Sequence, residues 1–225
     1  MFLIKRLFNF AFEIVQMEYS DKQKQIILSA ERLFSEKGYE GTSVRDIADE
    51  AGVNLAMISY YFGSKEKLME ALFEQRTTNI KLKVESLLQD DQRTPLQKVE
   101  ALADNYINRI IDKHGFFKIM LCEQLANKNT VIINLINDLK KRNTEEFGKL
   151  IKDGQQKGAF KKGIDVLLLM NMLIGSVTQT MITLNYYREY HRLTDISDNQ
   201  FYDIVRQKLS VHIKFLFKAL LSYEA

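Results

Sequence analysis

The side chains that most often carry catalysis or bind metals are few and widely spaced in this chain. Its three histidines, His114, His191 and His212, lie far apart and match no metal-ligand spacing such as H-E-x-x-H. The single cysteine, Cys122, falls in an apolar run, where we expect a buried small side chain rather than a reactive thiol. Phosphate-binding glycine loops and G-x-S-x-G elements are also missing. The sequence therefore predicts a protein that is not an enzyme and holds neither a metal nor a cofactor.

A different chemistry is available between residues 43 and 65, where hydroxyl, amide and cationic side chains lie among small apolar ones. Hydroxyls and cations bind the phosphate oxygens of DNA, and methyl-bearing side chains contact thymine methyl groups in the major groove. The candidates for such contacts are Ser43, Arg45, Asn54, Leu55, Ala56, Met57, Ser59, Tyr60, Tyr61 and Lys65.

These candidates divide by the contact that each side chain can make. Ala56 and Met57 are suited to thymine methyl groups, and Ser59 to a base edge or a phosphate. The tyrosine hydroxyls reach phosphate oxygens, Arg45 and Lys65 supply positive charge, and Ser43 can offer its hydroxyl and N–H at a helix N-terminus. Tyr61 is equally well explained as a core residue.

Short helices separated by glycines must position these side chains. The segments 20–23 and 43–46 each fit the capping-box pattern that opens a helix. Gly38, Gly52 and Gly63 follow the apolar runs at positions where glycine ends a helix. We therefore expect one longer helix followed by two short ones, with a further helix starting after Ser64.

The two short helices predict a helix-turn-helix. Counting from Val44, the fifth residue is Ala48, which is small where crossing helices approach each other, and the ninth is Gly52, which adopts a positive φ without strain. Asn54 can cap the second short helix. The positions that must fill the small core are apolar or aromatic, namely Ile47, Ala51, Val53, Ile58 and Tyr61.

The segment Thr42–Leu68, TSVRDIADEAGVNLAMISYYFGSKEKL, resembles the DNA-binding domain of the tetracycline-repressor (TetR) family of transcriptional regulators. Ala30–Ser43 resembles the first helix of that domain and the loop after it. The resemblance implies a three-helix DNA-binding domain, assigned to residues 17–64, in a homodimer that binds a near-palindromic double-stranded DNA operator. Ser59 stands where many members carry Tyr, so the operator sequence is left open.

Charge alone does not point to DNA. The chain carries a net charge of +3, and residues 18–68 hold seven basic and nine acidic side chains, which sum to −2. Any affinity for DNA must therefore come from the placement of charge on one face.

Composition favours an all-α fold. The 225 residues are 46% hydrophobic and 27% charged, which excludes a disordered chain, and one proline and ten glycines leave few turn formers. Beyond the first domain we expect a larger helical domain over residues 65–225, with helices at 65–88, 95–113, 116–126, 130–157, 165–190 and 199–222.

The last two of these helices are apolar on more than one side, which favours burial between two copies of the chain. The resemblance implies the same homodimer, formed by segments 165–190 and 199–222. It also implies a pocket in this domain for a small-molecule effector of unknown identity. The candidate pocket residues, each of which could also serve packing alone, are Tyr106, Arg109, Phe116, Phe117, Met120, Met170 and Gln179.

Residues 1–16 differ in character from the rest. They are rich in apolar side chains, but Asn9 and Glu13 interrupt the run, so neither a signal peptide nor a membrane span is expected. Three interpretations remain: translation that starts at Met17, a short helix packed on the body, or a membrane-surface anchor with Lys5 and Arg6 at the lipid headgroups.

The sequence thus predicts a cytoplasmic, ligand-responsive, DNA-binding regulator that acts as a repressor. Two alternatives stay open: a helical scaffold without sequence-specific DNA recognition, and a DNA-binding protein that organises the chromosome.

Overall fold

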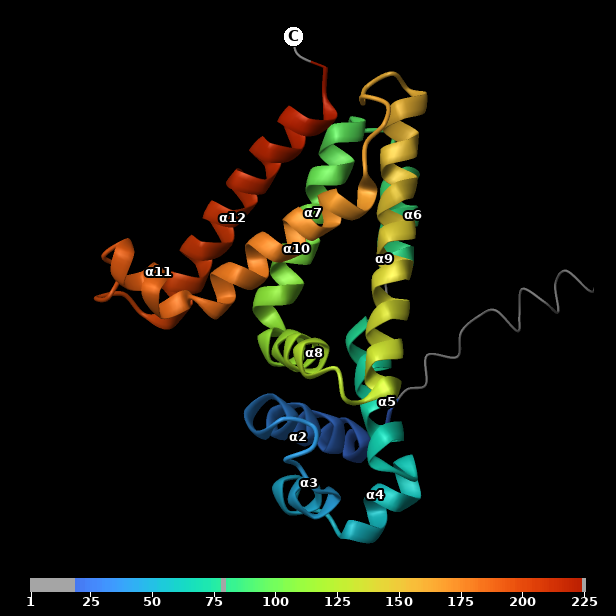
Figure 1. The fold of residues 1–225 in the computed structure, drawn as a ribbon, viewed down its shortest axis with the longest axis vertical. Helices are drawn as coiled ribbons and strands as arrows, with labels where there is room; N and C mark the ends of the chain where they lie inside the picture. Colours follow the sequence, from blue (N-terminus) through green and yellow to red (C-terminus); the bar gives the residue numbers. More distant parts are fainter. Residues whose placement is uncertain (1–18, 78–79, 224–225) are drawn as a thin grey trace, which may run out of the picture. The chain divides into compact units, whose positions relative to one another are not determined.

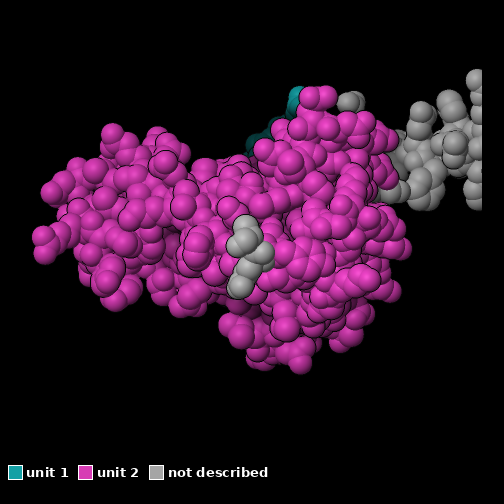
Figure 2. Space-filling view, turned by 90° about the horizontal axis from the view of Figure 1, so that it is seen from above, with its two compact units in different colours: residues 1–71 teal, residues 72–225 magenta. Residues whose placement is uncertain are grey.

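The computed structural model describes residues 19–77 and 80–223, and all regular elements in these ranges are helices (Figure 1). The predicted all-α fold is confirmed. The chain divides into two compact units, residues 1–71 and 72–225 (Figure 2). This division falls inside helix α5 (Lys65–Thr77), and the domain boundary expected at residue 64 lies directly before that helix. The segment 1–16 lies outside the described residues.

The first unit contains α2 (Asp21–Lys37), α3 (Val44–Glu50), α4 (Leu55–Phe62) and the first residues of α5. Both expected capping boxes are present, with the side chains of Ser20 and Ser43 accepting from the backbone N–H three residues later. Helix α3 packs against α2 and α4. The core between the helices is made by fully buried apolar side chains, including Ile26, Ile27, Phe34, Ile47 and Ile58.

The second unit contains seven further described helices: α6 (Ile80–Leu88), α7 (Pro95–Asp112), α8 (His114–Ala126), α9 (Thr130–Gln156), α10 (Val166–Ile182), α11 (Leu184–Tyr190) and α12 (Asp198–Leu221). Helix α7 packs against α6, α8, α9, α10 and α12, so it forms the centre of this unit. Its buried face meets Phe147 of α9 and Phe217 of α12, whose rings lie 5.8 Å apart.

The segment 165–190 is not the single helix that its apolar pattern predicts. It breaks at Thr183, and α10 and α11 are bent by 78°. The Thr183 hydroxyl donates to the Gln179 carbonyl at 2.8 Å, and Ser176 and Thr180 make the same kind of bond within the unbroken α10. Beyond the break, Arg188 packs over the Phe201 ring of α12 at 4.3 Å and pairs with Asp198 at 2.7 Å. These long-range contacts turn α11 toward α12.

Within the described ranges, no single helix is long and apolar enough to cross a membrane, although the bent pair α10–α11 passes the same criteria when taken together.

Two other helix boundaries lie at Lys113 and between α5 and α6. The predicted helices 95–113 and 116–126 leave a gap at residues 114–115, but the break lies at Lys113, and Gly115 belongs to the first turn of α8. Lys113 has ψ of 36° and therefore ends α7 itself. The helix expected over 65–88 corresponds to α5 and α6, and the connection at residues 78–79 lies outside the described residues.

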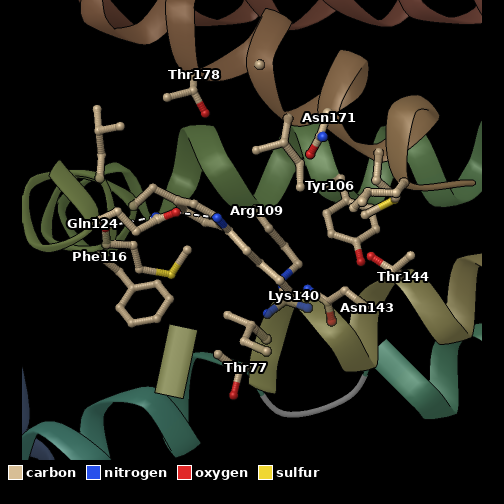
Figure 3. A pocket seen from close by; sticks show the side chains of 18 residues that line it. Thr77, Tyr106, Arg109, Phe116, Gln124, Lys140, Asn143, Thr144, Asn171 and Thr178 are labelled. Carbon is tan, nitrogen blue, oxygen red and sulfur yellow. Dashed lines mark hydrogen bonds between the residues drawn. The ribbon is translucent and has the colours of Figure 1, made fainter. Parts of the chain in front are cut away.

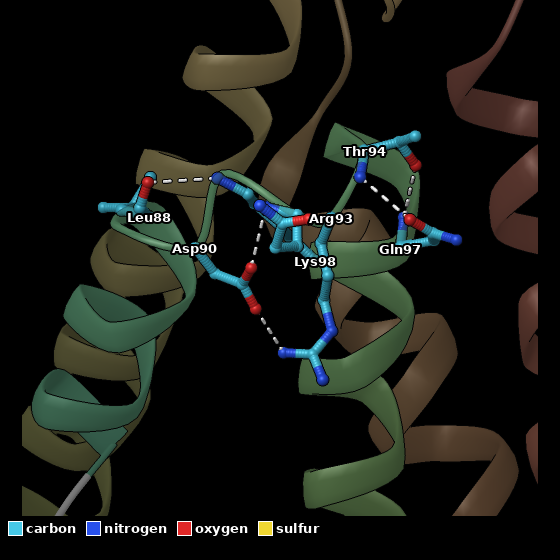
Figure 4. A network of polar contacts seen from close by, with 7 residues as sticks. Leu88, Asp90, Arg93, Thr94, Gln97 and Lys98 are labelled. Carbon is cyan, nitrogen blue, oxygen red and sulfur yellow. Dashed lines mark hydrogen bonds and ion pairs between the residues drawn. The ribbon is translucent and has the colours of Figure 1, made fainter.

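The turn between α6 and α7 is held by a buried lysine (Figure 4). Lys98 is only 1% exposed, and its Nζ donates to the Leu88 carbonyl at 3.0 Å, at the end of α6. Asp90 accepts from Arg93 at 2.7 Å in the same turn, and Thr94 caps α7. A carbonyl at a helix C-terminus is a favourable partner for a cation, which explains how Lys98 can be buried.

Candidate DNA interface and ligand cavity

The turn between α3 and α4 has the geometry of a helix-turn-helix. Gly52 has a φ of +59°, the left-handed conformation expected at the ninth position. The Asn54 side chain accepts from the Ala56 N–H at 2.9 Å and caps α4 as predicted. From α2, Gln25 Nε2 donates to the Ala51 carbonyl at 2.8 Å and so closes the C-terminus of α3. The relative orientation of α3 and α4 is therefore fixed by side-chain caps on both sides of the turn.

Helix α4 presents one buried and one open face. Ile58 and Phe62 are buried, whereas Leu55, Ala56, Ser59 and Tyr60 are exposed and Met57 is half-buried. Tyr60 is 83% exposed, the clearest case of a large aromatic side chain presented outward. Tyr61 is half-buried, with its ring 5.1 Å from that of Tyr60 and 6.4 Å from that of Phe62, so it belongs to both faces.

The N-terminus of α3 holds an acidic side chain, Asp46, which completes the predicted capping box of residues 43–46. Asp46 Oδ2 accepts from the Ser43 N–H at 2.8 Å and from the Ser43 hydroxyl at 2.6 Å. These hydrogen bonds to the carboxylate hold the pKa of Asp46 below its ordinary value. Both groups of Ser43 that were expected to reach phosphate are thus already occupied, so any phosphate contact there must replace Asp46.

Lys65 also makes hydrogen bonds within the first unit. Its Nζ donates to the carbonyls of Tyr39 and Thr42 at 3.0 and 3.2 Å, and it lies 4.0 Å from the centroid of the Tyr39 ring. Two of the three ammonium donors are therefore used to fasten the loop before α3, which leaves one for phosphate. Arg45, by contrast, is exposed on α3.

The second unit encloses a cavity of about 380 Å³ (Figure 3). Six of the seven candidate pocket residues line it: Tyr106, Arg109, Phe116, Phe117, Met120 and Met170. The seventh, Gln179, is exposed and is not in the lining; its neighbour Thr178 is. Because α10 carries one residue per 100° around its axis, this shift of one position moves the side chain to another face.

Part of the polar lining of the cavity comes from α9, a helix on which the sequence predicts no pocket residue. Leu139, Lys140, Asn143 and Thr144 follow the three- and four-residue spacing of one helix face, and all four line the cavity. That spacing is the signal that could have identified them, but polar residues on a helix face usually indicate a solvent-exposed surface. The remaining lining residues are Thr77, Leu121, Gln124, Leu167, Asn171, Ile174 and Gly175.

The charge of the lining is positive. Arg109 and Lys140 are its charged residues, and no lining residue is acidic. Arg109 Nη2 donates to the Arg76 carbonyl at 2.6 Å, while Lys140 Nζ donates to Gln124 Oε1. Burial lowers the pKa of Arg109, because desolvation disfavours its charged form. An anionic group on a ligand would offset that desolvation.

A model of the family described as bacterial regulatory proteins, tetR family, matches residues 26–72, and a model of the YsiA-like protein C-terminal region matches residues 73–220. This chain belongs to the tetR family. The fatty acid metabolism regulator protein of Bacillus subtilis (strain 168) is 26% identical to it over 162 residues, 72% of this chain and 82% of that protein. The probable HTH-type transcriptional regulator YttP of the same strain is 56% identical over 59 residues, 26% of this chain and 28% of that protein.

Solved structures of TetR-type regulators share the fold. The crystal structure of the transcriptional regulator FadR from Bacillus subtilis in complex with stearoyl-CoA aligns with a TM-score of 0.61. That alignment covers 84% of this chain and 96% of the FadR chain at 21% identity. The two-part organisation of this TetR-family chain, a helix-turn-helix unit followed by a larger helical unit, therefore agrees with the fold of known members.

Expectations for the remaining reactive side chains were partly wrong. Cys122 is exposed rather than buried, because it lies on the outer face of α8 while Ile119 and Glu123 face inward. Among residues 19–77 and 80–223, no group of three or more His, Cys, Asp or Glu side chains is arranged to hold a metal ion. His114 and His212 are exposed, and His191 lies 4.4 Å from Tyr187 in a ring contact.

Proposed function

We propose that this TetR-family chain is a cytoplasmic repressor that binds a near-palindromic operator as a homodimer and releases it when an amphipathic small molecule fills the cavity. The observation that supports this most directly is the cavity itself, which is apolar along most of its wall and positively charged at Arg109 and Lys140. Such a lining fits a ligand with a long apolar body and an anionic group. We assign the chain no catalytic activity.

The relatives support the same class of effector. The FadR structure from Bacillus subtilis contains stearoyl-CoA, which joins a long acyl chain to an anionic head. The B. subtilis relative is named for fatty acid metabolism. The aromatic and aliphatic side chains of the cavity, among them Phe116, Phe117 and Ile174, would surround the chain of such a molecule. A long-chain acyl compound is therefore the first effector to test.

On the DNA side, the exposed face of α4 would enter the major groove. Ala56 and Met57 would contact thymine methyl groups, Leu55 and Ser59 other base edges, and Tyr60 a phosphate. Arg45 supplies an exposed cation on α3, and Asn54, through its cap, orients the N-terminus of α4. Ser43, Tyr61 and Lys65 would contribute less to DNA binding. Ser43 is hydrogen-bonded to Asp46, Tyr61 is half-buried, and two of the ammonium donors of Lys65 already bond backbone carbonyls.

The homodimer would be formed by α10 and α12. Both helices leave large apolar side chains exposed in the single chain, which a partner copy would cover. Leu168 of α10 is 64% exposed, and Val211 and Phe215 of α12 are 64% and 70% exposed. Two DNA-binding units could then meet successive major grooves of one operator.

Release of the operator requires that the effector bind the DNA-free arrangement more tightly than the DNA-bound one. Helix α5 is a candidate for transmitting this preference, since it contains residues of both units and its last residue, Thr77, lines the cavity. The Thr77 hydroxyl also accepts from Arg142 Nη2 at 3.2 Å, which links α5 to α9. A ligand that displaces Thr77 would act on the end of α5.

Fluorescence anisotropy tests the proposal. The purified chain is titrated onto DNA from upstream of its own gene and onto scrambled DNA at about 150 mM salt, with and without stearoyl-CoA. We expect a preference of roughly a thousandfold for the upstream DNA and release by stearoyl-CoA but not by coenzyme A alone. Equal, weak binding to both DNAs, together with no enriched fragment in a genome-wide selection, would contradict the proposal that the chain binds a specific operator. Unchanged binding with stearoyl-CoA would contradict the acyl effector.

A further inference from the structure

Two side chains that line the cavity each carry a buried polar atom with no hydrogen-bond partner among the described residues. These atoms are the hydroxyl oxygen of Tyr106 on α7 and Oδ1 of Asn143 on α9. Tyr106 is 5% exposed, so its ring is held in place by the surrounding core. Figure 3 shows Tyr106, Asn143 and Thr144 on the same side of the cavity. Buried polar groups are almost always paired, so two unpaired atoms on side chains that line one cavity point to a polar group of a ligand as their missing partner.

The two atoms have complementary chemistry. The Tyr106 hydroxyl is protonated at neutral pH and can donate a hydrogen bond, and burial raises the pKa of Tyr106 further from neutrality. Oδ1 of Asn143 can only accept. A second acceptor, Glu146 Oε2, is also buried and unpartnered one turn further along α9, while Glu146 Oε1 accepts from Lys149 at 2.6 Å. These acceptors repel an anion, so the charged group of the ligand belongs nearer to Arg109 and Lys140.

We propose that this part of the cavity binds a hydroxyl group carried on the apolar chain of the effector, accepting from Tyr106 and donating to Asn143. This inference rests on the proposed amphipathic effector. A hydroxyl satisfies both protein atoms, an oxo group satisfies only the Tyr106 hydroxyl, and a methylene satisfies neither. The chain is thus a sensor that distinguishes oxygenated from unmodified acyl chains.

The test measures the affinity of the full-length chain for octadecanoic acid and for its mono-oxo and monohydroxy derivatives, with the oxygen moved along the chain. At the matching position we expect the hydroxy acid to bind about tenfold more tightly than the oxo acid, and the oxo acid about tenfold more tightly than the unmodified acid. Tyr106→Phe should remove both advantages. Asn143→Leu should remove only the advantage of the hydroxy acid over the oxo acid.

Tyr187→Phe is the matched control. Tyr187 is half-buried, and its pKa is also raised by burial, but it does not line the cavity. It should keep the wild-type order of affinities. If the wild-type chain binds all these acids equally well, or if Tyr106→Phe leaves the order unchanged, the hydroxyl site is wrong while the amphipathic effector stands. If it binds none of them or their coenzyme A thioesters, the effector class fails and the inference fails with it.

A second measurement needs no ligand. Because the Tyr106 hydroxyl has no partner in the folded chain, Tyr106→Phe should leave the melting temperature unchanged or raise it. A clear decrease would mean that the hydroxyl stabilises the fold through a bond of its own, and would overturn the proposal whatever the ligand results.

Discussion

Tyr60 and Tyr61 are neighbours on α4 with different surroundings. Tyr60 is 83% exposed, whereas Tyr61 is half-buried beside Phe62. Removal of the Tyr60 hydroxyl should therefore affect DNA binding and leave stability unchanged. We expect Tyr60→Phe to weaken operator binding about fivefold, through the loss of one hydrogen bond to phosphate, at an unchanged melting temperature. Tyr223→Phe, which changes another exposed tyrosine, is the control for anisotropy; an equal loss there would contradict the assignment.

The Ser43–Asp46 pair makes the stability of the first unit depend on pH. The two hydrogen bonds from Ser43 hold the pKa of Asp46 below its ordinary value of 3.8. A carboxyl group whose pKa is lower in the folded state stabilises the protein above the ordinary value and loses that effect as pH falls through the folded-state pKa. Asp46→Asn should lower the melting temperature at neutral pH, and the difference from wild type should vanish in strong acid. A difference that persists in acid would mean that the cap does not depend on the charge.

Single residues also show where sequence reasoning was limited. Six cavity residues on α7, α8 and α10 could be chosen because an aromatic, a methionine or an arginine within an apolar run is conspicuous. Lys140 and Asn143 could not, because the same residues on a solvent-exposed helix would give the same pattern. Exposure of Cys122 depends on the rotation of α8 about its axis, which is set by packing against α7 and α9.

At the scale of elements, helix ends marked by local caps were predictable, and breaks caused by distant contacts were not. Ser20 and Ser43 each form the predicted capping box, and Thr94 and Ser197 form the same arrangement, since both partners lie within four residues of each other. The break at Thr183 depends on packing of α11 against α12, which an apolar pattern does not reveal.

Helix α9 packs closely against the segment that follows it, where Gly154 lies against Phe160. A Cβ added at Gly154 would lie 2.1 Å from the ring of Phe160, a side chain only 1% exposed. Gly154→Ala should therefore destabilise the chain by about 2 kcal/mol, because the buried ring cannot move aside. At Gly148 in the same helix the nearest atom would be 3.9 Å away. Gly148→Ala should be neutral or stabilise the chain by up to about 1 kcal/mol. Urea unfolding measures both variants, and equal effects of the two substitutions would contradict the packing argument.

At the scale of the whole molecule, operator binding should depend on the dimer. Phe215 on α12 is 70% exposed in the single chain, so an arginine there is harmless to the monomer but places charge in the proposed interface. Phe215→Arg should sediment as a monomer and lose most operator affinity, although it stays folded. Leu125 on α8 is 78% exposed outside α10 and α12, and Leu125→Arg should remain dimeric. Dimers in both variants would place the interface elsewhere.

The cavity and the DNA-binding face lie in different units, so the effector and the operator should oppose each other without competing for one surface. Coupling between two sites has a fixed free energy and acts equally in both directions. If saturating effector weakens operator binding by about 50-fold, saturating operator should weaken effector binding by the same factor, within the usual range for coupled sites. Titration of operator at rising effector concentration should therefore show a Kd that increases and then reaches a plateau. A Kd that keeps rising in proportion to effector would mean direct competition at α4, because exclusion from a shared surface has no upper limit, and would contradict an effector site between α7, α8, α9 and α10.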